Sequence, residues 1–135
     1  MMGIKSRIFH PIEAVTLEQL VPDDHFYRQL ERTLDLTFVR ALVADCYAAG
    51  GRPSIDPIVF FKLQLVLFSE GIRPERQLVT VSADRLSVRW YLGYDLGESL
   101  LDHSSLTRIR HRYGLNIFRR LFGHVVEQCR AAELV

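Results

Sequence analysis

Apolar side chains recur at helical spacing along almost the whole chain. In residues 23–35, Phe26, Leu30 and Leu34 stand at four-residue steps. Residues 37–51 repeat the pattern and end in two glycines: Phe38, Leu42 and Cys46, with Val39 and Val43 beside them, then Gly50 and Gly51. Such a period favours helices that bury one face, whereas strands would alternate every second residue. Sustained alternation is found in no segment, so the chain is predicted to be all-α.

The strongest hydrophobic signal is the segment "SIDPIVFFKLQLVLFSEG". Asp56 is suited to cap a helix, and Pro57 suits the first turn, where its missing N–H costs nothing. Gly71 is suited to end the helix. Nearly every position between them is apolar, and a helix that is apolar on all sides is buried. This helix is therefore predicted to be the centre of the domain.

The flanking segments complete the predicted helices. "TLEQLV" opens at Thr16, a possible N-cap, and stops at Pro22. "PERQLVTVSADRLSVRWYLGY" predicts one bent helix or two short ones, since Ser82 and Asp84 offer an internal cap. "DLGESLLD" reads as a connecting loop. The final segment "LNIFRRLFGHVVEQCRAAELV" carries one apolar helical face: Phe118, Phe122, Val125, Val126 and Cys129.

Length and composition bound the class of protein. With 135 residues, 48% hydrophobic and 24% charged, the chain has the composition of one globular domain over residues 1–135. The longest apolar run is interrupted by Lys62 and is about half the ~20 residues of a membrane span. The N-terminus lacks the apolar stretch of a signal peptide, and two distant cysteines imply no disulfide framework. We expect a cytoplasmic, single compact helical bundle of about six to seven helices.

Positive charge is concentrated near the C-terminus. The chain has a net charge of +1, but residues 102–135 hold six arginines and three carboxylates, a net +3, which leaves −2 for the remainder. A local basic stripe on a nearly neutral body is typical of a surface that meets phosphate at one place. Such a stripe is also typical of an ordinary solvated helix face.

The segment "DHSSLTRIRHRYG" carries the centre of this stripe. Asp102, Ser104 or Ser105 could cap a helix that runs to Tyr113. An inward stripe is predicted for Leu106, Ile109 and Tyr113. The sides and outer face are left to Ser105, Thr107, Arg108, Arg110, His111 and Arg112. Small hydroxyls at the leading end and arginines one turn apart are what a helix in the major groove of DNA needs.

Four segments, in order, resemble the N-terminal domain of InsH-type insertion-sequence transposases. They are "PDDHFYRQLERTLDLTFVRALVADCY", "GRPSIDPIVFFKLQLVLFSEGIRPERQLV", "SVRWYLGYDL" and "DHSSLTRIRHRYG". The resemblance runs from about Ile8 to the C-terminus. It implies a helical DNA-binding domain, with "LFGHVVEQCRAAELV" as the helix before an RNase H-like catalytic domain. In this family Pro74 is often a serine, so proline's fixed dihedral is expected to start the helix at Glu75.

The same resemblance assigns catalysis and its divalent metal to Asp-Asp-Glu carboxylates beyond Val135. It therefore implies no catalytic residue, no metal site, no cofactor and no enzyme activity in these 135 residues. The sequence Asp102-His103-Ser104 is no hydrolase triad, because consecutive side chains at a helix start point in different directions. The five histidines show no zinc-ligand spacing. Paired acids such as Asp23 and Asp24 are explained by a helix N-terminus.

Several other residues allow two readings. Gly51-Arg52-Pro53 resembles the arms that enter the minor groove, but it also suits a loop before a helix, with Arg52 reaching a phosphate. Trp90 could stack on bases, although its apolar surroundings favour the core. Arg85 and Arg89 could extend a basic surface or pair with Asp84 or Glu75.

The predicted function is binding of double-stranded DNA at the terminal repeats of an insertion sequence. We expect a homo-oligomer when two ends are paired. We expect no membrane association and no small-molecule substrate. The predicted DNA-binding residues are Ser104, Ser105, Thr107, Arg108, Arg110, His111, Arg112, Arg52 and Arg76. A helix-turn-helix-like element is expected, and "GIRPERQLVTVSA", with Arg76, Gln77 and Thr80 outward, competes for the recognition helix.

A protein-interaction role is the alternative function. In this reading Phe118, Phe122 and Val125 would face a second transposase subunit as a dimerisation module. A related alternative is a truncated inhibitor that occupies the ends of the element without cutting them.

Overall fold

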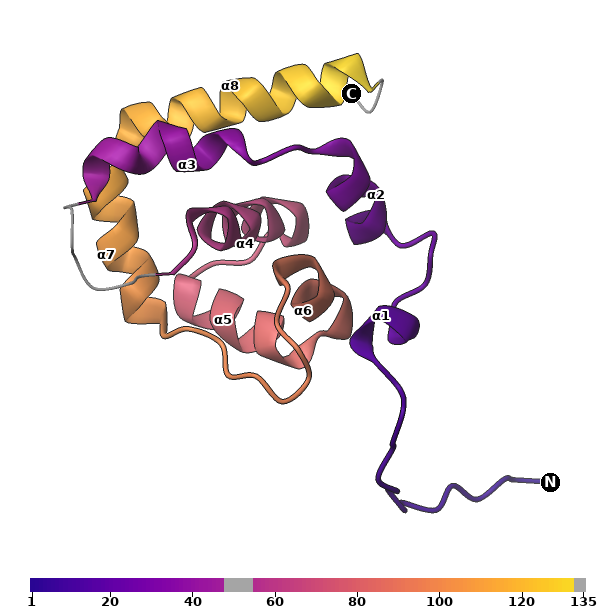
Figure 1. Cartoon of the computed structure of the whole chain (residues 1–135). Helices are drawn as coiled ribbons and strands as arrows, with labels where there is room; N and C mark the ends of the chain where they lie inside the picture. The colour runs from indigo at the N-terminus through magenta and orange to yellow at the C-terminus, as the bar shows by residue number, and fades with distance from the viewer. Residues whose placement is uncertain (48–54, 133–135) are drawn as a thin grey trace.

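The computed structural model describes residues 1–47 and 55–132. Within these ranges the chain forms eight α-helices and one 3-10 turn, and it forms no strand (Figure 1). The elements are α1 (Leu17–Leu20), α2 (Phe26–Thr33), α3 (Phe38–Val43), η1 (Ala44–Cys46), α4 (Pro57–Glu70), α5 (Glu75–Asp84), α6 (Leu86–Leu92), α7 (His103–Tyr113) and α8 (Leu115–Ala131). The all-α prediction is confirmed. The eight helices exceed the expected six to seven, because the segment from Glu75 to Leu92 forms two helices, α5 and α6.

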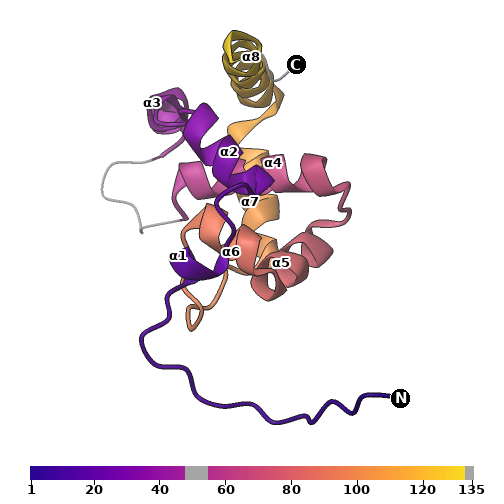
Figure 2. The same ribbon diagram turned by 90° about the vertical axis from the view of Figure 1, so that its right-hand side faces the viewer.

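Helix α4 is the centre of the fold. Asp56 accepts a hydrogen bond from the Ile58 N–H at 2.9 Å, Pro57 occupies the first turn, and Gly71 ends the helix with φ +63°, as predicted. Phe61 and Leu63, two positions apart and therefore on roughly opposite sides of α4, are both fully buried. Helices α3 and α8 lie on one side of α4, and α5 and α6 lie on the other (Figures 1 and 2). This arrangement confirms the predicted buried centre.

Leu30 and Leu34 are buried, as predicted for the α2 segment, but Phe26 is not. Phe26 is 53% exposed, whereas the next residue, Tyr27, is 1% exposed and stacks on Tyr91 with ring centroids 5.3 Å apart. The helix starts later than expected, because His25 Nδ1 accepts a hydrogen bond from the Tyr27 N–H at 3.0 Å. Asp23 and Asp24 therefore precede the helix instead of occupying its first turn.

Helix α8 buries most of the predicted apolar face, with one residue missed and one wrongly included. Leu121, which was not placed on the predicted apolar face, is fully buried, and Val125 is 8% exposed. Val126, which was predicted to lie on that face, is 47% exposed. Phe118 and Cys129 are partly buried against the core, as expected. The predicted glycine end of the α3 segment and Arg52 lie outside the described residues.

Helices α5 and α6 are separate, as one of the two readings allowed. The break is the extended backbone of Arg85, and neither Ser82 nor Asp84 provides a side-chain cap. Ser82 is instead fully buried within α5. Arg85 pairs with Glu70 at 2.7 Å, and Arg89 donates to the carbonyl oxygens of Ala83, Asp95 and Glu98. Both arginines thus stabilise the fold through these contacts, and neither pairs with Asp84 or Glu75.

A buried arginine joins α1 to the rest of the molecule. Arg28 is 8% exposed and donates from Nε and Nη2 to the Val21 carbonyl at 3.1 and 2.8 Å. Its guanidinium also pairs with Glu18 and lies 4.5 Å from the centroid of the Trp90 ring. The Trp90 indole N–H donates to Glu18 as well. Trp90 therefore packs within the protein, as its apolar surroundings in the sequence favoured.

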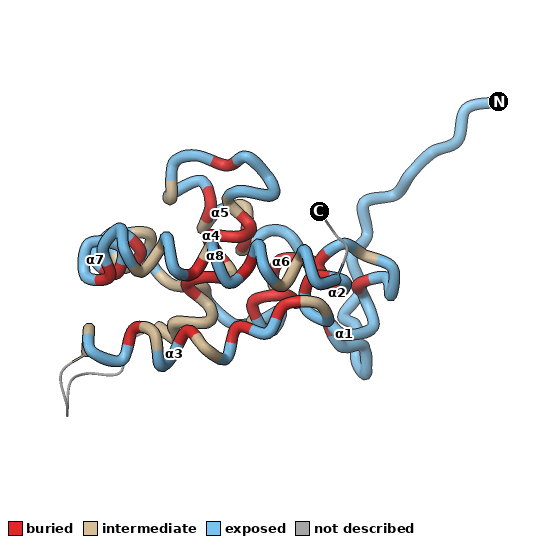
Figure 3. The backbone as a smooth tube through the Cα atoms, turned by 90° about the horizontal axis from the view of Figure 1, so that it is seen from above, coloured by how far each residue is buried: buried red, intermediate tan, exposed pale blue. Residues whose placement is uncertain are grey.

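Residues 1–16, which precede the one-turn helix α1, do not take part in this packing. The segment runs away from the helices and is exposed along its whole length (Figure 3). No helix in the described part of the chain is long and apolar enough to cross a membrane.

The Glu70 carboxylate links three helices and makes stability depend on pH. Its ion pair with Arg85 and the hydrogen bond from the Tyr27 hydroxyl, at 2.8 Å, hold the pKa of Glu70 below its usual value. A depressed carboxyl pKa contributes stability at pH values above the unfolded pKa, and this is lost as pH falls through the folded pKa. Replacement by Gln removes the charge but keeps an acceptor. We expect Glu70→Gln to lower the free energy of unfolding at pH 7 by roughly 1 kcal/mol.

Urea denaturation at pH 7 and at pH values below about 4 measures this difference. The deficit of Glu70→Gln should shrink at acid pH, because the wild-type carboxylate is then protonated. Glu127→Gln is the matched control, since Glu127 is exposed and lies 3.9 Å from Arg130. A Glu70→Gln deficit of equal size at both pH values would contradict the account.

Candidate nucleic-acid interface

Helix α7 begins at an acidic residue whose side chain does not cap it. Asp102 occupies the N-cap position, but its carboxylate accepts a hydrogen bond from the Ser104 hydroxyl at 2.6 Å and makes no side-chain cap. His103 Nδ1 lies 3.1 Å from the same carboxylate. The Ser104 hydrogen bond holds the pKa of the Asp102 carboxyl below its usual value. A negative charge therefore stands where the helix end would otherwise attract an anion.

The inward side of α7 is the predicted one. Leu106 is fully buried, and Ile109 and Tyr113 are each 5% exposed. The Tyr113 ring lies 5.4 Å from the ring of Phe60 and 5.6 Å from that of Phe61, both in α4. These contacts fix the rotation of α7 about its axis, and with it the direction of every polar side chain on the helix.

One exposed side of α7 carries Ser104, Arg108 and Arg112 at four-residue spacing, and we call these three residues the outer row. Arg108 donates to the Ser105 hydroxyl at 3.3 Å. The Arg112 guanidinium lies 5.4 Å from the centroid of the Tyr47 ring. Among the described residues no carboxylate pairs with either arginine. The outer row therefore presents two unneutralised cations one helical turn apart.

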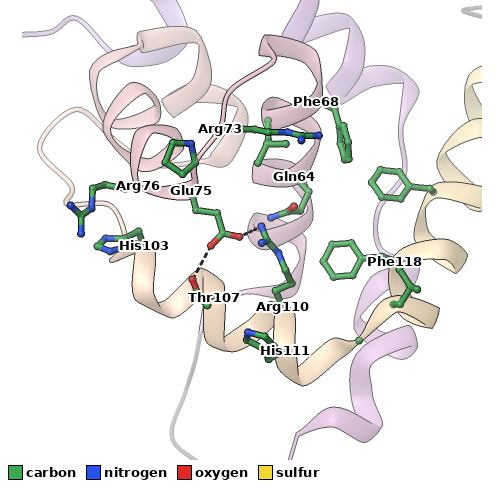
Figure 4. A pocket seen from close by; sticks show the side chains of 15 residues that line it. Gln64, Phe68, Arg73, Glu75, Arg76, His103, Thr107, Arg110, His111 and Phe118 are labelled. Carbon is green, nitrogen blue, oxygen red and sulfur yellow. Dashed lines mark hydrogen bonds and ion pairs between the residues drawn. The ribbon is translucent and has the colours of Figure 1, made fainter.

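The other exposed side of α7 is engaged with α5. Thr107 donates to Glu75 Oε2 at 3.0 Å, and Arg110 forms an ion pair with the same carboxylate (Figure 4). The Glu75 side chain is only 11% exposed. Thr107 and Arg110, which were both predicted to contact DNA, thus serve to hold α7 against α5. His103 and His111 lie on this side too and line a cavity beside the ion pair.

This cavity, the α4–α8 groove, has a volume of about 1140 Å³ and opens between α4, α5, α7 and α8 (Figure 4). Its lining combines aromatic side chains with basic ones: Phe68, Phe118 and Phe122, and Arg73, Arg76 and Arg110. Gln64 of α4 also lines it and is 4% exposed. Its Nε2 has no hydrogen-bond partner in the described part of the molecule.

Helix α5, the competing recognition helix, lies directly beside α7. It follows α4 after the four residues 71–74 and begins at Glu75 without a side-chain cap, as the proline at position 74 predicted. Arg76, Gln77 and Thr80 are exposed, and Leu78 is fully buried. The two candidate helices meet at the Glu75 carboxylate, so their exposed sides belong to adjacent parts of one surface.

Three residues of this region were missed by the sequence analysis: Arg73, Glu75 and Gln64. Arg73 was detectable from its place beside Arg76 in "GIRPER". The pairing of Glu75 with Arg110 was not detectable, because 35 positions separate two residues that only the packing of α5 on α7 brings together. Gln64 carried a signal, since it is an amide within the most apolar segment of the chain.

The histidines and acids form no evident metal centre. Among residues 1–47 and 55–132, no group of three or more His, Cys, Asp or Glu side chains is placed to hold a metal ion. His25 caps α2, and the His124 ring packs on Phe38 with centroids 4.3 Å apart. Cys46 and Cys129 are free thiols.

These features define an all-helical protein with unneutralised arginines gathered on two adjacent helices. The sequence model of a family described as "Transposase domain (DUF772)" matches residues 15–112, which is most of the chain. The chain therefore belongs to this family of transposase domains, and its role lies in DNA transposition. No curated protein and no solved structure matches it.

The two classes of arginine on α7 differ in their effect on stability. Arg110→Ala leaves the Glu75 carboxylate without its cation in a mostly buried position, which should lower the free energy of unfolding by about 1–3 kcal/mol. Arg108→Ala removes an exposed side chain and should change it by less than about 0.5 kcal/mol. Chemical denaturation of both variants at neutral pH measures the difference. If Arg110→Ala lowered the free energy of unfolding no more than Arg108→Ala, the ion pair of Arg110 with Glu75 would not stabilise the fold.

Proposed function

We propose that this chain is the DNA-binding domain of an insertion-sequence transposase and recognises the terminal repeats of its element. The observation that carries the proposal is the outer row of α7. Its two arginines are exposed, are paired with no described carboxylate, and stand on a helix that Leu106 and Tyr113 anchor to the core. The InsH-type resemblance supports the same assignment, and residues 1–135 are taken as one DNA-binding unit.

Arg108 and Arg112 suit DNA because of their spacing and their chemistry. Four residues of α-helix span about 6 Å, so the two guanidinium groups can reach neighbouring phosphates or a phosphate and a base edge. A guanidinium presents a planar fork of donors, which matches two phosphate oxygens or the N7 and O6 atoms of guanine. The Tyr47 ring beside Arg112 restricts the freedom of that side chain before DNA arrives.

The Asp102 carboxylate sets the direction in which α7 approaches DNA. Its negative charge at the first turn disfavours a phosphate at the helix N-terminus, although that position is often used in anion binding. We therefore propose that α7 meets the duplex along the outer row and not end-on. In this arrangement Thr107 and Arg110 position the helix through Glu75. His111 and Ser105 flank the contact, and Arg76 extends it onto α5.

The proposed role is recognition and not cleavage. By resemblance, strand transfer belongs to an RNase H-like domain whose carboxylates match no residue of this chain. We expect no nicking of a duplex by this chain with Mg²⁺ or Mn²⁺. Since the target is DNA, and both cysteines are free thiols, we place the protein in the cytoplasm.

Subunit assembly remains the second candidate. The residues first suggested for a dimer face turn largely inward, since Val125 is 8% exposed and Phe118 packs 5.8 Å from the Phe61 ring. The same helix nevertheless exposes Leu115 by 64% and Val126 by 47%. A homo-oligomer formed through α8 would be compatible with DNA binding, because two ends must be held together. Sedimentation with and without DNA separates the two roles.

Binding of labelled duplexes to the full chain tests the proposal. We expect tighter binding to the terminal repeat than to a scrambled duplex of the same composition. We also expect affinity to fall steeply with salt, by about 0.9 log unit per log unit of salt for each phosphate contact. Absent binding, or binding that salt and sequence leave unchanged, would remove the proposal. A dimer with no affinity for either duplex would favour the assembly role.

Substitution of the outer row assigns the contacts. Arg108→Ala or Arg112→Ala should weaken terminal-repeat binding by about 1–3 kcal/mol and relax the preference at one base pair if the contact is to a base. If the contact is to phosphate, binding to all sequences should weaken evenly and the salt slope should drop by about one.

Arg130→Ala is the matched control, because Arg130 is exposed and lies in the last turn of α8. That end of α8 is far from α7 (Figure 1). The affinity of this variant should equal that of the wild type. If the outer-row variants also bind like the wild type while Arg76→Ala or Gln77→Ala abolishes binding, α5 is the recognition helix and our assignment is wrong.

A further inference from the structure

Gln64 is an unusual residue for its position. It lies in the middle of α4, is 4% exposed, and its Nε2 has no acceptor among the described residues. A buried amide without a partner lowers stability, so such a group in a native fold calls for a physical explanation. Figure 4 shows the Gln64 side chain directed into the α4–α8 groove beside Arg110. A polar ligand atom in the groove would supply the partner, after a small rotation of the amide.

The side of the groove formed by α4 and α8 offers flat apolar surfaces. Phe68 is 56% exposed, and its ring meets that of Phe122 edge to face, with centroids 5.0 Å apart and planes at 81°. Phe118 stands beside them (Figure 4). Exposed aromatic rings of this kind stack readily on nucleobases, whichever base is presented.

Basic side chains also line the groove, and one of them, Arg73, lies beside Phe68 (Figure 4). Arg73 and Arg76 are exposed and pair with no carboxylate in the described part of the chain. Glu75, the acidic residue of the lining, is neutralised by Arg110. His103 and His111 add donors on the α7 side (Figure 4). This charge is complementary to a phosphate group and unfavourable for a second cation.

We propose that the α4–α8 groove binds one unpaired nucleotide of the DNA that the domain holds. The base would lie against Phe68 and Phe122 with its polar edge toward Gln64, and the phosphates would meet Arg73 and Arg76. A volume of about 1140 Å³ is ample for a base with its sugar and phosphate. The inference rests on the proposed DNA binding, but it concerns a different part of the surface from the outer row.

The N-terminal segment of a second copy is the competing occupant. It carries exposed apolar residues, with Ile4 96%, Phe9 81% and Ile12 72% exposed. However, Lys5 and Arg7 lie among them, so the segment would bring positive charge to a positively charged rim. Charge complementarity therefore favours the nucleotide.

The test compares a fully paired duplex with a bulged duplex. The two are identical except that the bulged duplex has one extra, unpaired nucleotide at its centre. We expect the full chain to bind the bulged duplex about tenfold more tightly in fluorescence anisotropy. Gln64→Leu, which keeps the size of the side chain but removes the amide, should lose this preference and still bind both duplexes. Gln29→Leu, at an exposed position of α2, is the matched control and should retain the preference.

A second measurement needs no variant. In ¹⁵N-labelled wild-type protein, the Gln64 side-chain amide signal should shift with the bulged duplex and not with the paired one. Equal affinity for the two duplexes together with an unmoved Gln64 signal would overturn the nucleotide site and leave the proposed function standing. No binding to either duplex would overturn both. If the bulged duplex shifts the Gln64 signal only in protein that lacks residues 1–15, the N-terminal segment occupies the groove in the full chain.

Discussion

The burial of α4 is the constraint on which the rest of the molecule depends. A helix with apolar residues on all sides has no face that is favourable in water, so other helices must cover most of its surface. Phe60, Phe61 and Leu63 are fully buried as a result. Each covering helix uses its own apolar stripe for this purpose. The charged residues of the covering helices are thereby directed outward or into the contacts between them.

Helix α7 shows how this constraint produces a candidate binding surface. Its inward stripe packs on Phe60 and Phe61 through Tyr113, which fixes the helix rotation. One flank is then close enough to α5 for Arg110 to pair with Glu75, while the other flank has no neighbouring carboxylate among the described residues. The separation into a structural flank and an available flank follows from packing, and it determines which arginines are free for the proposed contact with DNA.

The arginines of this chain fall into two groups that composition alone cannot separate. Arg28, Arg85 and Arg110 pair with carboxylates and stabilise the fold, whereas Arg108 and Arg112 have no such partner in the described residues. A net charge of +1 therefore understates the basic character of the α5 and α7 surface. The proposed phosphate contacts would use the second group, because a paired guanidinium must first leave its carboxylate.

Local signals allowed much of the fold to be predicted. The limits of α4 followed from Asp56, Pro57 and Gly71, and the inward stripe of α7 followed from helical spacing. Errors arose where two neighbouring residues were both apolar, as with Phe26 and Tyr27, because spacing alone does not choose between adjacent faces. The cap at His25 and the pairing of Glu75 with Arg110 depend on details and long-range contacts that a single sequence does not contain.

The most direct test of the central claim is a map of the backbone amides of the full chain as terminal-repeat duplex is added. The account predicts the largest ¹H–¹⁵N shifts and line broadening at Ser104, Arg108 and Arg112, weaker changes on the first turn of α5, and none at the far end of α8. Changes confined to Arg76, Gln77 and Thr80, with α7 unmoved, would contradict it.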